Sequence, residues 1–371
     1  MTNNPCTSGM RLAFFLATSG HSGVDRVMKN LMNELASRDI KVDLLRIKNH
    51  GPYMEASSKN VNIIELGTSH VNSSLLKLIR YMKKYQPYAI LSDKDRVNRV
   101  VLLAVRMAGV PTKVFVRTGT TVSVHLKQRS LSEKWFQYLS YNYLYQWAEA
   151  VIVPSHGAAE DLFKISGLSR DQIRILHSPV VSQELYNLAN ENIDHSWFSD
   201  DQTPIILGVG ELSDRKDFST LIKAFALVRR ERSCKLVILG EGRKRDDLIR
   251  LSADLKVEED VWLPGFIQNP YPYMKQADLF VLTSNCEGSP VVLIEALSLG
   301  VPSVSTDCPS GPREILQDGQ VGSLVPVGDV DALSEAMIHT IENPLPKEIL
   351  MSAIKPYEVS YATEKYLGVI M

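Results

Sequence analysis

Short apolar runs of strand length alternate with amphipathic helical segments along most of the chain. In the first half, aliphatic-rich runs begin near residues 11, 41, 61, 88, 113, 150 and 173. Most of the segments between them carry apolar residues three or four positions apart, as in the stripe of Val24, Val27, Leu31 and Leu35. Strand-length runs separated by helices are typical of a parallel sheet with helical crossovers. Residues 1–185 are therefore predicted to form one α/β domain.

The same alternation restarts after a polar stretch. Residues 179–203 lose the periodicity, which predicts a linker. Strand-like runs then begin near residues 204, 234, 261 and 278, and they predict a second α/β domain over 200–345. Residues 355–371 predict a terminal helix, which we expect to pack back on the first domain. Open α/β sheets bind ligands beyond the carboxyl ends of their strands, so we expect the site in a cleft between the domains.

Composition narrows the class of protein. The 371 residues are 44% hydrophobic and 22% charged, as in an average soluble globular protein. No apolar run approaches the roughly 20 residues of a membrane helix, and the first apolar run fits a strand better than a signal peptide. The four cysteines lack the spacing of a zinc or disulfide framework. We therefore expect a cytoplasmic protein.

Charge is distributed unevenly between the two predicted domains. Residues 1–185 contain 24 Lys and Arg against 14 Asp and Glu, a net charge of +10, and the remaining residues have a net charge of −11. A basic half predicts an anionic partner. No nucleic-acid-binding motif accompanies this charge, so nucleic acid is not the expected partner.

Two acids stand out in TSNCEGSPVVLIEALSLGVPSVST, residues 283–306. Ser289 suits an N-cap and Pro290 the first position of a helix, which places Glu287 in the loop before that helix and Glu295 in its second turn. A carboxylate among aliphatic side chains requires hydrogen-bond donors, and the hydroxyl groups of a ribose would supply them to Glu295. For Glu287, a simple complement to the helix dipole is an equally good interpretation.

The start of this helix offers a second binding element. Backbone amides around Gly288, Ser289, Pro290 and Val291 lie at the positive end of the predicted helix, where a polar ligand can accept hydrogen bonds. Gly288 also lets a ligand approach the backbone closely.

The arrangement E-G-x-P-x-x-x-x-E closely resembles the signature of the retaining family 4 glycosyltransferases of GT-B fold. The resemblance is dense from about 205 to 340, with GEGRKRDDL and GSLVPVGDVDALSEAM as further parts, and sparser before that. It implies two Rossmann-like domains facing an interdomain cleft, with a nucleotide-sugar donor on the C-terminal domain and the acceptor on the N-terminal one. It also implies that Glu287 contacts the sugar near the anomeric carbon, that Glu295 holds the ribose, and that Phe266 and Ile267 lie beside the nucleobase. For Phe266, a place in the core is the alternative.

The resemblance further implies a cationic loop that grips the diphosphate, within GVGELSDRKDFSTLI. Lys216 matches the lysine of the family, but Glu211 stands where an arginine is common. Arg215 is a candidate substitute, because a guanidinium binds phosphate in a bidentate manner. The alternatives are that Glu211 weakens donor binding, or that this loop is only a solvated run of charges.

The N-terminal domain contributes fewer candidates. Gly23 in TSGHSGVDR matches a glycine-rich loop of the family and would let a phosphate or sugar approach, although a simple turn is the alternative and the fingerprint G-x-G-x-x-G is absent. Arg117 matches a family arginine, whereas Gly119 replaces the histidine that many relatives carry two residues later. Arg117 and His125 are the acceptor-side candidates.

Two helical segments predict where an anionic partner would bind. Residues 73–85 carry Lys77, Arg80, Lys83 and Lys84 beside an apolar face. Residues 131–148 carry seven aromatic side chains: Trp135, Phe136, Tyr138, Tyr141, Tyr143, Tyr145 and Trp147. Such helices can lie on anionic membranes. The alternative is an ordinary surface helix and a packed core helix.

Together these features predict a retaining glycosyltransferase that moves a hexose or N-acetylhexosamine from a nucleotide sugar, with UDP as the expected nucleotide, to a glycan or lipid-linked acceptor in cell-surface polysaccharide biosynthesis. Lys216 and Glu287 are the expected catalytic residues. The enzyme is expected to need no metal or other cofactor, and to lie in the cytoplasm or at the cytoplasmic face of the membrane. The alternatives are a non-catalytic sugar-nucleotide-binding protein and another GT-B enzyme such as a sugar-nucleotide epimerase.

Overall fold

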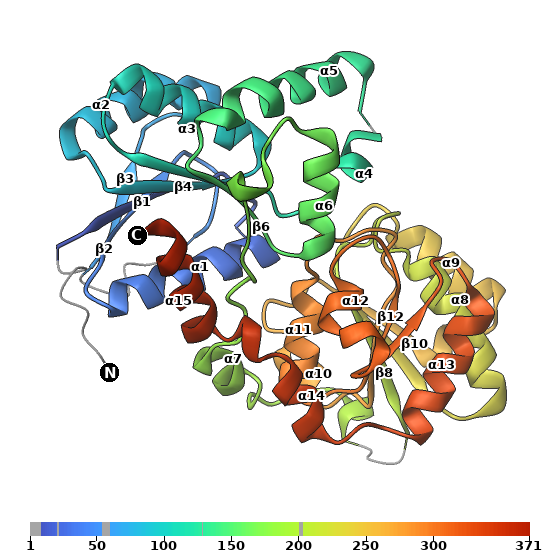
Figure 1. Cartoon of the computed structure of the whole chain (residues 1–371). Helices are drawn as coiled ribbons and strands as arrows, with labels where there is room; N and C mark the ends of the chain where they lie inside the picture. The colour runs from blue at the N-terminus through green and yellow to red at the C-terminus, as the bar shows by residue number, and fades with distance from the viewer. Residues whose placement is uncertain (1–8, 21, 54–59, 128, 200–202) are drawn as a thin grey trace. The chain divides into compact units, whose positions relative to one another are not determined.

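The protein folds into two compact units (Figure 1). Unit 1 comprises Met1–Val180 together with Val359–Met371, and unit 2 comprises Val181–Glu358. The computed structural model describes residues 9–20, 22–53, 60–127, 129–199 and 203–371. Cys6 and His21, the latter part of the predicted glycine-rich loop, lie outside the described residues.

Unit 1 is built on a seven-stranded parallel sheet in the order β3-β2-β1-β4-β5-β6-β7. Its strands are β1 (Arg11–Phe15), β2 (Lys41–Arg46), β3 (Val61–Glu65), β4 (Ala89–Asp93), β5 (Lys113–Arg117), β6 (Ala150–Val153) and β7 (Ile173–Ile175). The central strands are buried along their whole length, as the continuous apolar runs predict for a sheet covered on both faces.

Helices cover both faces of this sheet. They are α1 (Gly23–Ser37), α2 (Leu75–Tyr85), α3 (Asp95–Ala108), α4 (Val122–Lys127), α5 (Leu131–Leu139), α6 (His156–Ile165) and the terminal α15 (Val359–Ile370). In Figure 1, α2 and α3 lie above the sheet, whereas α1 and α15 pack together below it. The ion pair between Arg38 and Glu364 joins α1 to α15. The C-terminal helix is therefore part of unit 1.

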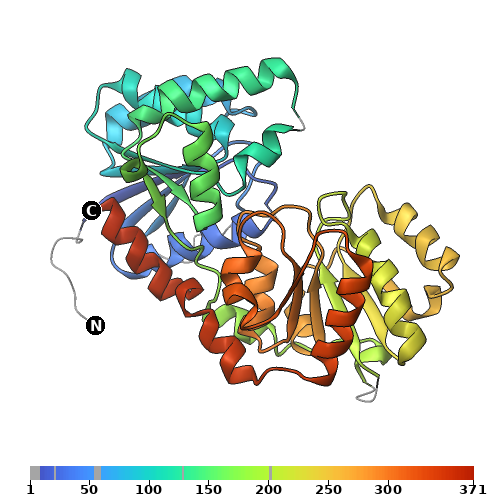
Figure 2. The same cartoon turned by 45° about the vertical axis from the view of Figure 1, so that its right-hand side comes forward.

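Unit 2 repeats the plan with a six-stranded parallel sheet in the order β10-β9-β8-β11-β12-β13. Its strands are β8 (Ile205–Val209), β9 (Lys235–Leu239), β10 (Val261–Gly265), β11 (Leu279–Leu282), β12 (Ser303–Thr306) and β13 (Ser323–Val325). Its helices are α7 (Gln183–Leu188), α8 (Phe218–Glu231), α9 (Arg245–Asp254), α10 (Tyr271–Lys275), α11 (Val291–Ser298), α12 (Pro312–Ile315), α13 (Val330–Glu342) and α14 (Lys347–Ala353). Figure 2 shows the two sheets from a second direction. The predicted α/β class with two parallel sheets is confirmed.

The strand order of each sheet reverses at one point. In unit 1 the reversal lies between β1 and β4, and in unit 2 between β8 and β11. In open α/β sheets, the loops that leave the carboxyl ends of two such strands diverge and leave room for a ligand. Each unit therefore has one position where the fold itself favours binding.

The predicted linker is partly helical. Within residues 179–203 the chain forms α7 and a 3-10 turn, Ser196–Phe198. Ser182 caps α7 by accepting a hydrogen bond from the amide of Leu185, which is 2% exposed. A helix of six residues is too short for its apolar periodicity to be recognised. Unit 2 accordingly begins at Val181, because α7 packs on α10, and extends beyond residue 345, because α14 packs on α11.

The aromatic segment 131–148 is not one regular helix. It comprises α5, a π-helical turn (Ser140–Leu144) and a 3-10 turn (Tyr145–Trp147). Tyr141 and Tyr145 are fully buried, and their hydroxyl groups donate to Asp95 of α3. The core interpretation therefore holds for these two aromatics, whereas the other five side chains are exposed by 39% or more. No helix in the described part of the chain is both long and apolar enough to span a membrane.

Candidate functional site

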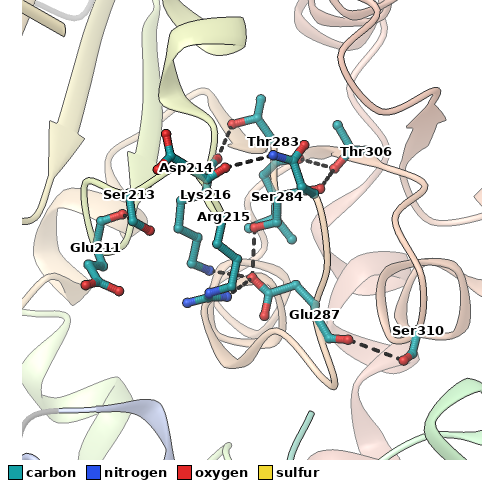
Figure 3. A network of polar contacts seen from close by, with 12 residues as sticks. Glu211, Ser213, Asp214, Arg215, Lys216, Thr283, Ser284, Glu287, Thr306 and Ser310 are labelled. Atoms are coloured by element: carbon teal, nitrogen blue, oxygen red, sulfur yellow. Dashed lines mark hydrogen bonds and ion pairs between the residues drawn. The ribbon is translucent and has the colours of Figure 1, made fainter. Parts of the chain in front are cut away.

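The candidate site lies in unit 2, at the carboxyl ends of the neighbouring strands β8 and β11. Residues 210–217 leave β8, and residues 283–290 leave β11. Hydrogen bonds join the two loops: the Thr283 hydroxyl donates to the Lys216 carbonyl at 2.9 Å, and the Asn285 amide donates to the Arg215 carbonyl at 2.8 Å. The two loops therefore form one surface at the reversal point of the sheet (Figure 3).

One carboxylate oxygen is the centre of this surface (Figure 3). Oε1 of Glu287 accepts hydrogen bonds from Nζ of Lys216 at 2.7 Å, Nη1 of Arg215 at 3.0 Å and Oγ of Ser284 at 2.8 Å. The side chains of Glu287 and Lys216 are each 9% exposed, whereas that of Arg215 is 43% exposed. Lys216 and Arg215, the two cations predicted to bind the diphosphate, thus both contact Glu287, the acid predicted to contact the sugar.

The protonation state of Glu287 follows from this environment. Burial disfavours the charged carboxylate, but the charges of Lys216 and Arg215 and the hydrogen bonds outweigh burial, so the pKa of Glu287 lies below its ordinary value. The carboxylate is therefore ionised at neutral pH. Burial, reinforced by the Glu287 charge, raises the pKa of the nearby Cys308 to about 12, so this thiol remains protonated.

A glycine makes room for the lysine. A Cβ atom at Gly210 would lie 3.0 Å from Cε of Lys216, closer than ordinary van der Waals contact. The left-handed backbone of Asp217, with φ +46°, turns the chain directly into α8, whose first turn its side chain caps. Lys216 is therefore held between Gly210, against which its side chain packs, and the cap of α8 that follows it.

Glu211 does not take part in the network. Its side chain is exposed, forms no ion pair within the described part of the chain, and lies apart from Glu287 in Figure 3. The position that commonly holds an arginine in the family therefore adds no cation here, and Arg215 is the second cation that contacts Glu287.

Glu295 lies in the second turn of α11 and is buried, with 1% of its surface exposed. Oε1 of Glu295 accepts a hydrogen bond from the Tyr271 hydroxyl of α10 at 3.0 Å. The buried carboxyl group, for which ribose hydroxyl groups were the expected partners, therefore has at least one donor from the protein itself.

The helix begins later than predicted. Pro290, with ψ +99°, is the N-cap, and Val291 is the first helical residue. Ser289 therefore precedes the cap, and its buried Oγ has no hydrogen-bond partner in the described structure. Gly288 packs against Gly311. A Cβ atom added to Gly311 would lie 3.0 Å from the carbonyl oxygen of Gly288.

The remaining candidate of unit 2 is the pair after β10. Phe266 is 54% exposed, so the alternative of a place in the core is wrong, and Ile267 is partly buried beside it. Both follow Gly265, the last residue of β10. An exposed aromatic ring in this loop is of the kind that can stack on a nucleobase.

In unit 1, Arg117 is the acceptor-side candidate whose contacts the structure describes. Arg117 is 3% exposed, donates from Nη1 to Asp93 at 2.6 Å and from Nη2 to Ser178 at 2.9 Å, and so joins β5 to β4 inside the unit. Gly23 is the first residue of α1, directly after the N-cap Ser22 and next to the reversal point. His125 belongs to α4, and its side chain lies outside the described structure.

Three residues of the site, Ser284, Gly210 and Tyr271, are not among those predicted from the sequence. The G-x-G of GVGEL is a signal for a close approach at Gly210. Tyr271 offers no such signal, because its contact with Glu295 depends on how α10 packs against α11. Within the described residues, no three His, Cys, Asp or Glu side chains are placed to hold a metal ion.

Two family descriptions match the chain in succession. The description "Glycosyltransferase Family 4" matches residues 21–184, and "Glycosyl transferases group 1" matches residues 189–356. The first match covers most of unit 1 and the first four residues of unit 2, and the second contains Lys216, Glu287 and Glu295.

Curated relatives and solved structures agree with these matches. An N-acetylgalactosamine-N,N'-diacetylbacillosaminyl-diphospho-undecaprenol 4-alpha-N-acetylgalactosaminyltransferase of Campylobacter jejuni is 30% identical over 342 residues, 90% of each chain. The lipopolysaccharide outer core galactosyltransferase WaaB superposes with a TM-score of 0.73 at 20% identity, covering 97% of this chain and 99% of that one. Anabaena HepE in complex with UDP superposes with a TM-score of 0.77 at 16% identity over the same shares. The chain therefore belongs to the glycosyltransferases of GT-B fold.

Proposed function

We propose that the protein transfers a hexose or N-acetylhexosamine from a UDP-sugar to a glycan on a lipid carrier, with retention at the anomeric carbon, in cell-surface polysaccharide biosynthesis. The observation that carries the proposal is the ionised Glu287 carboxylate, bound by Lys216 and Arg215 at the reversal point of the unit 2 sheet. The acceptor class is supported by the diphospho-undecaprenol in the name of the 30% identical relative. The nucleotide is supported by the UDP bound to HepE.

The chemistry follows from the charges. The bond between the anomeric carbon and the diphosphate breaks, and a bond from that carbon to an acceptor oxygen forms. Lys216 and Arg215 stabilise the negative charge that develops on the diphosphate, and the Glu287 carboxylate stabilises the positive charge that develops at the sugar. The departing phosphate oxygen takes the acceptor proton, so Gly119 in place of a histidine is compatible with turnover.

Binding of the donor nucleotide would use residues on both sides of this network. Glu295 is proposed to hold the ribose, with Phe266 and Ile267 beside the base and the backbone from Gly288 to Val291 beside the sugar. The structural alternative for Glu295 is that its hydrogen bond with Tyr271 only fastens α10 to α11. Gly23 is proposed to let the ligand approach unit 1. We further propose that no metal is needed and that the enzyme works at the cytoplasmic face of the membrane.

A nucleotide-sugar panel tests the proposal. A UDP-sugar is expected to raise the thermal midpoint of the protein and to be hydrolysed slowly, or transferred when a polyprenyl-diphosphate glycan is added, in the presence of EDTA. Lys216→Met is expected to lower turnover by about 10²-fold. Lys223→Met, which removes an exposed lysine of α8, is the matched control and should leave turnover unchanged.

The outcomes separate the rival functions. Stabilisation by UDP-sugars without turnover on any acceptor would favour the non-catalytic binding protein. Conversion of one UDP-sugar into its epimer would favour the epimerase, and equal loss of activity in both lysine variants would contradict the role of Lys216.

A further inference from the structure

The carboxyl ends of β1 and β4 form the reversal point of unit 1, the counterpart of the position that holds the network in unit 2. Open α/β sheets favour ligands at such a point. Residues 16–20 leave β1, and Lys94 directly follows β4. Lys94 and Tyr53 both have exposed side chains, and neither takes part in the core or in the proposed donor site.

The backbone of Lys94 is strained. Its φ of +74° lies in a region that residues other than glycine rarely adopt. Asp93, which is buried, holds this conformation: its Oδ1 accepts a hydrogen bond from the Lys94 amide at 2.7 Å, and its Oδ2 accepts one from Arg117 at 2.6 Å. Lysine is also a poor choice for this place, because it is the N-cap of α3 and its side chain forms no capping hydrogen bond. Stability of the fold therefore does not explain the lysine.

The ammonium group of Lys94 has no carboxylate partner in the described part of the chain. Its Nζ contacts the carbonyl oxygen of Ala17, two residues beyond β1, at 3.4 Å. The side chain thus reaches from the end of β4 to the end of β1. A lysine without a counter-charge can bind a phosphate as a point charge.

Tyr53 places an aromatic ring on the loop that leaves β1. A Cβ atom added to Gly20, whose φ is +92°, would overlap the ring, so a glycine is needed for the ring to lie against this backbone. Gly51 exchanges two backbone hydrogen bonds with Thr18, at 2.9 and 3.2 Å, which ties the segment before Tyr53 to the same loop. The ring nevertheless remains 44% exposed.

A buried acid holds the loop beneath this ring. Asp25 of α1 is 1% exposed and accepts hydrogen bonds from the Thr18 hydroxyl and, at 2.9 Å, from the Ser22 amide. The position of the Tyr53 ring is therefore fixed by Gly20 and by a loop that is itself hydrogen-bonded to the core of α1. A fixed ring loses little freedom when a ligand binds it.

These two exposed groups suit different parts of one ligand. The apolar C–H face of a sugar ring can pack on an aromatic ring, while the tyrosine hydroxyl remains in water. Lys94 contacts Ala17, and the next residue, Thr18, pairs with the segment that carries Tyr53. A ring and a cation on the same short loop are matched by a sugar that is linked to a phosphate.

We propose that unit 1 recognises the acceptor at this point, with an acceptor sugar stacked on Tyr53 and the acceptor diphosphate bound by Lys94. The inference rests on the proposed function, because it assigns the residues that distinguish one acceptor from another. It makes Tyr53 a determinant of glycan binding and Lys94 a determinant of preference for a charged acceptor.

Two matched acceptors test the assignment: a short-chain polyprenyl-diphosphate glycan, and the same glycan on a neutral alkyl chain. Tyr53→Ala and Tyr53→Leu are expected to raise KM for both acceptors about fivefold, whereas Tyr53→Phe keeps the ring and should resemble the wild type. Tyr53→Leu also retains apolar bulk against Gly20, so that loss of the ring is separated from collapse of the loop. Calorimetric affinity for UDP should be unchanged in all three variants.

Lys94 is tested with the same pair. Lys94→Met is expected to raise KM for the diphosphate acceptor about tenfold and to leave KM for the neutral one unchanged, and Lys94→Arg should restore most of the difference. The controls are Tyr143→Ala, which removes a tyrosine that is 66% exposed elsewhere in unit 1, and Lys41→Met, which removes an exposed lysine at the amino end of β2. Both should behave like the wild type, and thermal midpoints check that every variant is folded.

Unchanged KM values in Tyr53→Ala would overturn the stacking assignment, and equal increases for both acceptors in Lys94→Met would overturn the phosphate assignment. Weaker UDP binding by Tyr53→Ala would place Tyr53 in the donor site instead. Calorimetric titration of each acceptor into the protein saturated with UDP measures binding without turnover. A wild type that binds the acceptor through Tyr53 and Lys94 but transfers no sugar would contradict the proposed function alone, whereas transfer with no effect of either residue would contradict this inference alone. A wild type that neither binds nor transfers would contradict both.

Discussion

At the residue scale, Glu287 combines burial with two cationic neighbours, and its charge is what the proposed chemistry uses. Glu287→Gln keeps the shape but removes the charge, so we expect kcat to fall by about 10²–10³-fold, with a smaller change in the affinity for the nucleotide. Steady-state kinetics and calorimetry with the donor measure the two effects. Glu335→Gln, an exposed acid of α13, is the matched control. An unchanged kcat would contradict the role of Glu287.

The same residue gives a pH dependence of stability. Because the folded pKa of Glu287 is depressed, its contribution to stability is complete above the unfolded value of about 4.3 and is lost as the pH falls through the folded value. The free energy of unfolding of the wild type should therefore fall more steeply below about pH 4 than that of Glu287→Gln. Urea titrations at several pH values measure this, and parallel curves would contradict the assignment.

Tyr271 separates the two interpretations of Glu295. Tyr271→Phe removes the hydroxyl that donates to the Glu295 carboxylate and keeps the packing of the ring. If Glu295 also holds the ribose, Glu295→Gln should weaken UDP binding about tenfold or more, by roughly 1.5–3 kcal/mol for a hydrogen bond to a charged group. Tyr271→Phe should weaken it less. Calorimetric titration with UDP measures both, and wild-type affinity in Glu295→Gln would leave Glu295 a purely structural role.

At the scale of elements, α15 completes unit 1 although it is separated from the rest of that unit by the whole of unit 2. Leu367 is 5% exposed on the face that α15 buries. Leu367→Ala should lower the free energy of unfolding of unit 1 by about 3 kcal/mol, whereas Lys365→Ala on the exposed face should change it little. Denaturation followed by tryptophan fluorescence measures the difference. Equal stability of the two variants would show that α15 does not contribute to the fold of unit 1.

The elements were largely predictable because their signals are local. The apolar runs at 11–17 and 88–92 predicted β1 and β4 to within two residues, since buried parallel strands are continuously apolar. The contacts of the site were less predictable because they join distant segments. Lys216 and Glu287 were each proposed as donor-binding residues, but their pairing across 71 positions depends on β8 and β11 being neighbours.

Arg117 makes a contact that its own segment does not indicate. It was expected on the acceptor side because it matches a family arginine, and it is buried and paired with Asp93 of the neighbouring strand. Nothing in the two separate runs indicates this pairing, since register between parallel strands is set by the sheet as a whole. The sequence of 131–148 likewise does not separate its five exposed aromatics from the buried Tyr141 and Tyr145. The π-helical turn at Ser140–Leu144 changes which side chains face the core, and the sequence does not indicate that turn.

At the scale of the whole molecule, two units of the same open α/β plan carry different chemistry. Unit 2 presents the cationic and acidic network expected of a donor site, whereas residues 1–185, most of which belong to unit 1, carry a net charge of +10. The strand reversal between β8 and β11 explains why the side chains of the network lie at the carboxyl ends of these two strands. The network of Lys216, Arg215 and Glu287 is the feature on which the proposed activity depends most.

The most direct test of that activity is the anomeric configuration of the product. The full chain is incubated with the α-linked UDP-sugar that stabilises it and with a polyprenyl-diphosphate glycan, and the new linkage is assigned by NMR coupling constants. A retaining transfer predicts an α-linked product that Glu287→Gln forms much more slowly. A β-linked product, or no product with any stabilising donor, would contradict the account.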